Sequence, residues 1–358
     1  MIARRQFLQM LPALTLVDPA VRRVFAAQHA KIKAGQIGTK HAHASGKIGT
    51  MRKFSDLYDF VGVVEPDDKR WSTVKDTPTY KGVPRLSEEQ LLGQADVQLV
   101  AVETEVRQLL EVADRCVQAG KHIHLDKPAG EDLAHFDKIL KNATIKKLNV
   151  QMGYMFRYNP GFQFLFNAIR EGWLGEIFEV HTVMSKKVND ATRRQLAEYP
   201  GGTMFELGCH IIDAVVTALG QPDRVTAYTR RTRDQDPLAD NQLAVFEYPK
   251  ATATVRSSVV EVNGGRRRQF VACGTKGSIE IIPLEAPQLV LTLDEPQGEY
   301  ARGRQSVELP VLGGRYDGDF LDLARVLHGE KPSDFPPQHD LAVQKAVLQA
   351  SGVRLVPK

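Results

Sequence analysis

Residues 31–43 read KIKAGQIGTKHAH and carry the pattern on which the predicted fold depends. A short apolar run, 31–38, ends at a glycine, and residues 42–53 have the composition of a helix. A glycine that follows a short apolar run is typical of the turn that joins a β-strand to the next helix. The folded part of the chain is therefore predicted to open with a strand, a glycine turn and a helix.

Apolar runs and helical stretches continue to alternate up to about residue 152. The further predicted strands are 59–64, 97–102, 122–125 and 148–152, and the predicted helices are 106–119 and 133–141. Because helices of crossover length separate most of these strands, the pattern favours a parallel, doubly wound sheet of the Rossmann type over residues 28–150.

After about residue 155 strands follow one another with few helices between them. In residues 252–259, Ala253, Val255 and Val259 share one face while polar side chains occupy the other, as in a strand with one wetter face. The predicted helices of this part are 160–171, 204–219, 319–327 and 340–350. The predicted fold class is therefore α/β: the Rossmann-type domain, then an α+β domain over 151–358 with a mostly antiparallel open sheet.

The composition narrows the class of partner. The 358 residues are 42% hydrophobic, and no apolar run is long enough to span a membrane. Three scattered cysteines do not suggest a disulfide framework. The formal net charge is +4, but residues 1–27 alone hold four arginines against Asp18, so the remainder is nearly neutral. We expect a small-molecule partner and no nucleic acid.

The first 27 residues resemble a twin-arginine export signal. Residues 3–8 read ARRQFL, residues 10–17 are mainly apolar, and Val24-Phe25-Ala26 offers small residues near a cleavage position. This resemblance implies a periplasmic or extracytoplasmic protein. The alternative is a basic, partly helical tail that stays attached to a cytoplasmic protein.

The turn after the first strand is the candidate cofactor site. A dinucleotide fingerprint needs a glycine for the tight turn and small residues where backbone meets pyrophosphate. The predicted contacts are the turn residues Gly38, Thr39, Lys40 and His41, with Glu65 at the end of the second strand. A carboxylate at Glu65 favours NAD through a ribose hydroxyl, whereas Lys40 could receive the phosphate of NADP. Glu65 is otherwise a solvated strand end.

A second group of candidate site residues follows the predicted strand 122–125, at the edge where parallel sheets bind ligands. Asp126 and Pro128 flank Lys127 there, and all three are also predicted cofactor contacts. The Lys127–Pro128 bond could be cis. An ammonium in the cleft stabilises an alkoxide that forms on a substrate. A surface lysine in a turn is the alternative.

The stretch 204–219 is apolar except for one narrow seam. Glu206, His210, Asp213 and Thr217 lie within about 40° of one another if the stretch is α-helical. Histidine is the natural base for taking a hydroxyl proton near neutral pH, and Glu206 or Asp213 could orient it. The alternative is a solvated helix edge.

With these motifs in order, the chain resembles the glucose-fructose oxidoreductase / inositol dehydrogenase (Gfo/Idh/MocA) family. The motifs on which this resemblance rests are the Gly38 turn, AGKHIHLDKP at 119–128, RYNP at 157–160, and Gly201-Gly202 through Glu206, His210 and Asp213. The resemblance implies NAD or NADP, a sugar or polyol substrate, Lys127 and His210 as catalytic residues, and a homodimer or homotetramer. The domain over 151–358 then binds the substrate and mediates oligomerisation.

Asp126 stands for the family's usual glutamate and Glu206 for its usual aspartate, which are mild changes. Two further positions depart from the family pattern on the cofactor side. Lys40 replaces the second glycine of the fingerprint, and Glu103 stands in VETE (102–105) where a Thr-Pro turn is usual. Both residues belong to the part of the chain that is expected to bind the cofactor. Glu103 is accordingly one of the predicted cofactor contacts. Arg157 and Tyr158 are predicted substrate contacts, with packing at the domain junction as the alternative.

Histidine pairs were also considered as metal ligands. His41 with His43, and His122 with His124, could each chelate an ion, but no carboxylate or cysteine completes either set at ligand spacing along the chain. The sequence therefore predicts no metal site.

Together these features predict an NAD(P)-dependent oxidoreductase that transfers a hydride between nicotinamide and a hydroxyl of a sugar, glycoside or polyol. The prediction requires Lys127 and His210 to meet in one crevice. An NAD-dependent glycosidase that oxidises its substrate transiently, and a non-catalytic sugar- or nucleotide-binding protein of the same fold, are the alternatives.

Overall fold

The computed structural model describes residues 18–311 and 313–353, which form two compact units. The first, called the Rossmann unit below, consists of residues 18–155 and 313–341. The second unit consists of residues 156–311 and 342–353. The second domain, predicted over residues 151–358, therefore lacks residues 313–341, which return to the first unit.

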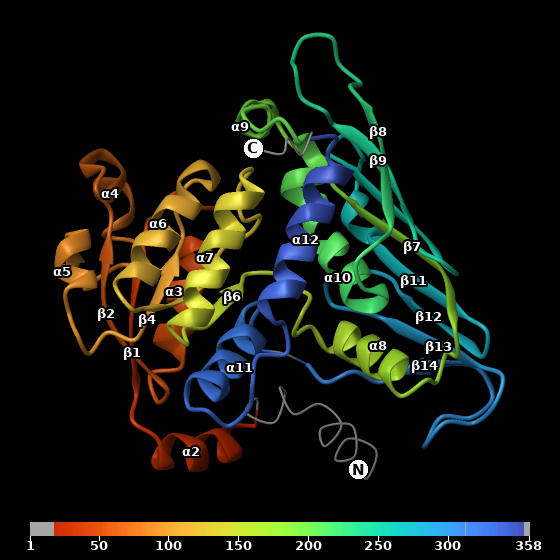
Figure 1. Cartoon of the computed structure of the whole chain (residues 1–358), viewed down its shortest axis with the longest axis horizontal. Helices are drawn as coiled ribbons and strands as arrows, with labels where there is room; N and C mark the ends of the chain where they lie inside the picture. The colour runs from red at the N-terminus through yellow and green to blue at the C-terminus, as the bar shows by residue number, and fades with distance from the viewer. Residues whose placement is uncertain (1–17, 312, 354–358) are drawn as a thin grey trace. The chain divides into compact units, whose positions relative to one another are not determined.

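The Rossmann unit contains the predicted parallel sheet (Figure 1). Its strand order is β3-β2-β1-β4-β5-β6, and every neighbouring pair is parallel. The strands are β1 (Ile32–Ile37), β2 (Tyr58–Val64), β3 (Arg85–Leu86), β4 (Leu99–Val102), β5 (His122–Leu125) and β6 (Val150–Met152). Because all strands run the same way, the residues that follow β1, β2, β4 and β5 meet at one edge of the sheet.

Helices connect and cover this sheet. They are α3 (Ala44–Lys53), α4 (Asp68–Val74), α5 (Glu88–Leu92), α6 (Val106–Gln118), α7 (Leu133–Ile145) and α11 (Asp317–Leu327). Helix α6 packs against α7, and α3 packs against α11 (Figure 1). Phe320 and Leu323 of α11 are buried in one core with Met51 and Phe54 from the α3 region. This apolar face explains why α11 joins the Rossmann unit.

Helix α2 (Pro19–Gln28) also belongs to the Rossmann unit. The Asp18 side chain accepts a hydrogen bond from the Ala20 amide and caps its first turn. Phe25 is 6% exposed in the same core, and the Arg22 side chain donates to Asp56 at 2.8 Å. The candidate cleavage segment Val24-Phe25-Ala26 thus lies inside a packed helix. The twin-arginine motif itself lies outside the described residues.

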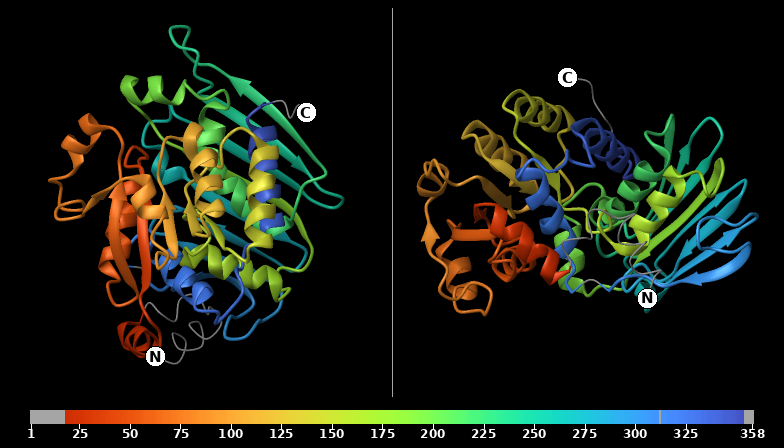
Figure 2. Two further views of the ribbon diagram at one scale, coloured as in Figure 1. Left: turned by 60° about the vertical axis from the view of Figure 1, so that its left-hand side comes forward. Right: turned by 90° about the horizontal axis from the view of Figure 1, so that it is seen from below.

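The second unit is built on an eight-stranded sheet with the order β14-β13-β12-β11-β7-β10-β9-β8. Strands of this sheet are coloured from green to blue in Figure 2. Only β7 and β10 pair in parallel, so the predicted mostly antiparallel sheet is confirmed. The strands are β7 (Ile177–Ser185), β8 (Arg224–Arg230), β9 (Asn241–Glu247), β10 (Thr252–Ser258), β11 (Gln269–Gly274), β12 (Gly277–Ile281), β13 (Leu289–Leu293) and β14 (Gly303–Val307).

The described residues of this unit contain the α-helices α8 (Pro160–Arg170), α9 (Asp190–Leu196) and α10 (Cys209–Leu219). A further helix, α12 (Pro337–Ala350), begins in the Rossmann unit and ends in the second unit. Helix α10 packs on β7, β10 and α8, which accounts for its apolar circumference. Across the part of the chain that the structure describes, no helix has both the length and the apolar character needed to cross a bilayer.

Candidate active site and cofactor pocket

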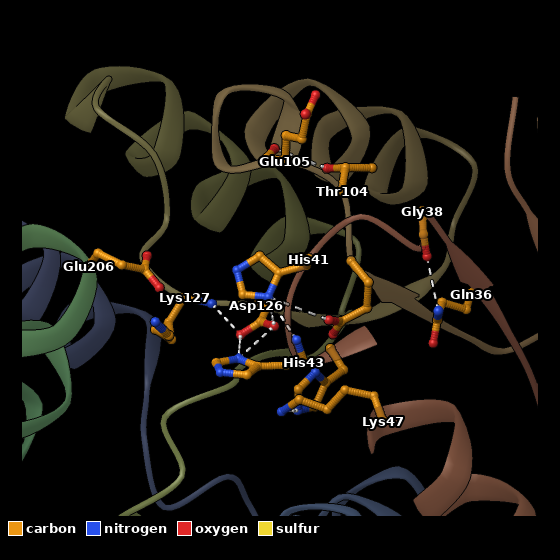
Figure 3. A network of polar contacts seen from close by, with 12 residues as sticks. Gln36, Gly38, His41, His43, Lys47, Thr104, Glu105, Asp126, Lys127 and Glu206 are labelled. Atoms are coloured by element: carbon orange, nitrogen blue, oxygen red, sulfur yellow. Dashed lines mark hydrogen bonds and ion pairs between the residues drawn. The ribbon is translucent and has the colours of Figure 1, made fainter. Parts of the chain in front are cut away.

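Gly38 makes the turn after β1 possible. Its φ of +91° is unfavourable for other residues, and a Cβ there would lie 2.7 Å from the Glu103 carbonyl oxygen and the Thr104 nitrogen. The Gln36 side chain also donates to the Gly38 carbonyl at 2.9 Å (Figure 3). The turn therefore lies directly against the end of β4, as a dinucleotide fingerprint requires.

A cavity of about 650 Å³ opens at the carboxyl ends of β1, β2 and β4. Its lining includes Gly38, Lys40, Glu65, Arg85, Thr104 and Gln108. A glycine turn beside a cavity with basic side chains suits the pyrophosphate and adenosine of a dinucleotide. The residues found here thus fit this cofactor class. The other predicted contacts, Thr39, His41, Glu103, Asp126, Lys127 and Pro128, are not among the lining residues.

Glu65 is buried at the end of β2, with 3% of its surface exposed, so it is not a solvated strand end. One carboxylate oxygen accepts hydrogen bonds from the Thr39 amide at 3.1 Å and the Thr39 hydroxyl at 2.6 Å. The other accepts from the Asp67 amide at 3.1 Å. The carboxylate holds the turn after β1, while its contact with a ribose stays a prediction.

Asp126, at the end of β5, is the centre of a histidine and carboxylate cluster (Figure 3). The Nδ1 atom of His41 lies 2.7 Å from Asp126 Oδ2, and that of His43 lies 3.1 Å from the same oxygen. Glu103 Oε2 lies 4.0 Å from His41 Nδ1. Asp126 is the carboxylate that local spacing did not indicate as a third ligand for the histidine pair, because it lies 83 residues from His43 along the chain.

Burial sets the charges of this cluster. Burial alone would raise the pKa of Asp126, but His41 and His43 outweigh it and hold this pKa well below its usual range. Burial, together with the nearby Asp126, raises the pKa of Glu103 well above its usual range. Burial lowers the pKa of His43 to about 4, so this imidazole is neutral at pH 7.

Lys127 is 2% exposed, which excludes the alternative of a surface lysine. Its backbone amide donates to Asp126 Oδ1 at 2.7 Å, and the Lys127–Pro128 bond is cis. A second buried lysine, Lys47 of α3, was not singled out from the sequence. Its Nζ lies 3.5 Å from Asp319 Oδ2 and 3.4 Å from His124 Nε2.

The catalytic candidates of the second unit lie on a helix that differs from the prediction. Residues Met204–Gly208 form a π-helical turn, and α10 begins only at Cys209. The wider turn changes the angle between Glu206 and His210 that a continuous α-helix would give, and π-turns are frequent at functional sites. Glu206 is partly exposed, whereas His210 and Asp213 are 3% and 1% exposed.

Asp213 forms a buried ion pair with Arg157. The guanidinium donates to Asp213 Oδ1 from Nη2 at 2.7 Å and from Nε at 3.1 Å, and each side chain is 1% exposed. Tyr158 is 2% exposed. From the sequence, Arg157 is a predicted substrate contact and Asp213 a predicted catalytic residue. The two residues are 56 positions apart along the chain, so no local pattern indicates that they form an ion pair.

Two family models match this chain. Residues 32–154 match the model described as an oxidoreductase family with an NAD-binding Rossmann fold, and residues 162–280 match the GFO/IDH/MocA C-terminal domain. The chain belongs to the GFO/IDH/MocA oxidoreductase family. The resemblance inferred from its motifs is thereby confirmed, with Lys40 and Glu103 as departures within that family.

Relatives in the GFO/IDH/MocA family include uncharacterized proteins and named dehydrogenases. The uncharacterized oxidoreductase YhhX of Escherichia coli (strain K12) is 30% identical over 207 residues, covering 56% of this chain and 58% of that protein. The scyllo-inositol 2-dehydrogenase (NADP(+)) IolW of Bacillus subtilis (strain 168) is 26% identical over 199 residues, covering 53% and 55%. The chain thus spans just over half the length of these curated relatives.

Among solved structures, the WlbA dehydrogenase from Bordetella pertussis in complex with NADH and UDP-GlcNAcA has a TM-score of 0.73 at 16% identity. The similarity covers 90% of this chain and 95% of that chain, and it shows that the two share a fold.

Proposed function

We propose that this chain catalyses NAD(P)-dependent oxidation or reduction of a hydroxyl group on a sugar or polyol. The observation that carries the proposal is the buried imidazole of His210, which α10 presents beside a π-turn in the family's C-terminal domain. The relative named as a scyllo-inositol 2-dehydrogenase supports a polyhydroxylated substrate.

The side chains have separate roles in this proposal. Gly38 and the cavity beside it would hold the nucleotide, and a bound nicotinamide would supply the hydride donor or acceptor. His210 exchanges the proton of the reacting hydroxyl, and Lys127 stabilises the oxygen as negative charge develops on it. Glu206, partly exposed, orients the substrate through its hydroxyls, and Arg157 holds the side chain of Asp213, a residue of α10, in place.

A preference for NAD over NADP is part of the proposal. Glu65 places a carboxylate at the cavity, which disfavours a 2′-phosphate, and Lys40 already pairs with Asp67 at 3.4 Å. Fluorescence titrations with NADH and NADPH test this preference, and tighter binding of NADPH would reverse it.

The activity is tested by following cofactor reduction by the purified full chain with free sugars, glycosides and inositols. His210→Gln is expected to lower kcat by about 10²–10⁴-fold while NADH binding is retained, because it removes a proton-transfer group. His181→Gln is the matched control, since His181 lies on β7 of the same unit and bonds Thr254 at 2.8 Å. Failure to bind either nucleotide, or equal kcat values for His210→Gln and wild type, would contradict the proposal. Glycoside cleavage without net NADH would instead identify the glycosidase alternative.

Export and self-association complete the proposal. The Arg4-Arg5 motif supports twin-arginine export, and replacing both residues by lysine is expected to retain the protein in the cytoplasm. Cell fractionation measures this, and unchanged export would contradict it. The family resemblance supports a homodimer or homotetramer, which light scattering on the purified chain measures.

A further inference from the structure

The cluster around Asp126 contains donor types that bind metal ions. His41 and His43 come from the turn after β1, Glu103 follows β4, and Asp126 follows β5. The side chains of His41, His43 and Asp126 lie together in Figure 3. Two imidazoles and two carboxylates thus meet at one edge of the parallel sheet, all within the Rossmann unit. This donor set is typical of zinc and related transition metals, rather than of Mg²⁺ or Ca²⁺, which prefer oxygen alone.

The spacing of these atoms suits a single cation. One ligand atom each from His41, His43 and Asp126 can be chosen so that all lie within 4.8 Å of one another. Ligand bonds to zinc are about 2.0–2.2 Å long, so small side-chain movements bring all three atoms into one coordination sphere. The ring centroids of the two histidines are 4.8 Å apart, and both Nδ1 atoms lie close to the same oxygen, Asp126 Oδ2.

Backbone hydrogen bonds orient the cluster before any ligand binds. The Lys127 amide donates to Asp126 Oδ1 at 2.7 Å and orients this carboxylate. Its Oδ2 lies near both imidazoles, and its Oδ1 also lies 3.2 Å from His43 Nδ1. The His41 amide donates to the Glu103 carbonyl at 3.2 Å and ties the turn to β4. Supporting hydrogen bonds of this kind are a regular feature of metal sites.

Glu103 provides an independent indication. Its side chain is completely buried, and neither carboxylate oxygen receives a hydrogen bond from the described residues. A buried carboxyl group without a donor is costly. The charged groups that act on Glu103 are Asp126, which raises its pKa, and Lys47 and Lys127, which lower it. Glu103 Oε2 lies 4.0 Å from His41 Nδ1, so a cation held by the histidines would give this carboxylate a partner.

We propose that His41, His43, Asp126 and Glu103 bind one divalent transition-metal cation of the zinc class. The His43 side chain, 15% exposed, provides the way in from solvent. The cation would join the ends of β1, β4 and β5. The competing explanation is a cluster without a metal, in which the N–H groups of the two imidazoles donate hydrogen bonds to the Asp126 carboxylate.

The test measures metal binding by the nucleotide-free full chain. The protein is stripped with EDTA and titrated with Zn²⁺ in a calorimeter, and metal that survives gel filtration is counted by mass spectrometry. One zinc ion per chain is expected. Replacing zinc by Co²⁺ is expected to produce visible absorption bands of a site with nitrogen and oxygen ligands.

Variants assign the site to these residues. His43→Ala and Asp126→Asn are each expected to weaken zinc binding by at least about 10-fold. His135→Ala is the matched control, because His135 lies on α7 of the same unit, is partly exposed and pairs with Asp114 at 3.5 Å. It is expected to bind zinc as the wild type does.

Three results would overturn the proposal: no stoichiometric zinc on the wild-type chain, equal affinity in His43→Ala, or equal loss in His135→Ala. Circular dichroism melting checks that each variant is folded. If His43→Ala does not fold, His43→Gln keeps a polar side chain of similar size and takes its place. The result does not depend on the proposed dehydrogenase activity, because no nucleotide or substrate is present.

Discussion

At the scale of single residues, the molecule contains buried charges that are satisfied by specific partners. Arg157 and Asp213 are the clearest pair, since both are 1% exposed and share two hydrogen bonds to one oxygen. Removing one member of such a pair leaves the other buried without compensation, which costs about 3–5 kcal/mol. The role of Arg157 in stability can therefore be separated from a role in substrate binding.

Arg157→Met is expected to lower the free energy of unfolding of the full chain by about 3–5 kcal/mol. The double variant Arg157→Met/Asp213→Leu is expected to recover part of this loss, because no charge is then left buried. Urea denaturation of the three proteins measures both effects. If Arg157→Met instead keeps wild-type stability and only raises KM, Arg157 is a substrate contact.

His122 gives the protein a predictable dependence on pH. Burial lowers its pKa, and its Nδ1 accepts a hydrogen bond from the Asn149 amide at 2.8 Å, which a proton on this nitrogen would break. The unfolded chain, with a histidine pKa of about 6.5, takes up this proton first as the pH falls. The contribution of His122 to the free energy of unfolding is therefore fully present above about pH 6.5, and it is lost as the pH falls below this value.

Thermal melting of wild type and His122→Gln between pH 7.5 and 5.5 tests this sign. The wild type is expected to lose more of its melting temperature on acidification than the variant does, because glutamine does not titrate. Parallel losses in the two proteins would show that His122 makes no contribution in this range.

At the scale of elements, α2 is part of the Rossmann core. Phe25→Ala is expected to lower the free energy of unfolding by about 3 kcal/mol, because it opens a cavity beside Met51 and Phe54. Val24→Ala, at a position 61% exposed, is the matched control and should change stability by less than about 0.5 kcal/mol. Urea denaturation measures the difference, and similar effects at the two positions would contradict the packing of α2.

The same contacts bear on where an export leader can be removed. Cleavage after Ala26 would take Phe25 and Arg22 away from the folded core. A chain that begins at residue 27 is therefore expected to melt at a lower temperature than one that begins at residue 18.

At the scale of the whole molecule, the Rossmann unit is discontinuous in sequence. Residues 313–341 supply Phe320, Leu321 and Leu323 to its core and Asp319 to the buried Lys47. Residues 18–155 alone are therefore expected to lack a cooperative melting transition. Joining them to residues 313–341 through a flexible glycine and serine linker is expected to restore it. Cooperative melting of residues 18–155 alone would contradict this dependence on α11.

The sequence by itself determined the architecture of both units. The parallel sheet follows from apolar runs that alternate with helices, and the turn at Gly38 follows from a glycine at the end of a strand. These signals are local, since periodicity and turn chemistry act over a few residues. The family resemblance followed from motifs of the same short range, at 119–128 and 157–160.

Only the tertiary structure decided which distant residues meet. Asp126 completes the histidine pair from 83 residues away, Arg157 finds Asp213 across 56, and α11 returns to a sheet that ends at Met152. The π-turn before Cys209 also departs from the α-helical spacing that the apolar pattern predicts. The physical reason is the same in each case: packing and burial of charge depend on distance in space, which separation along the chain does not encode.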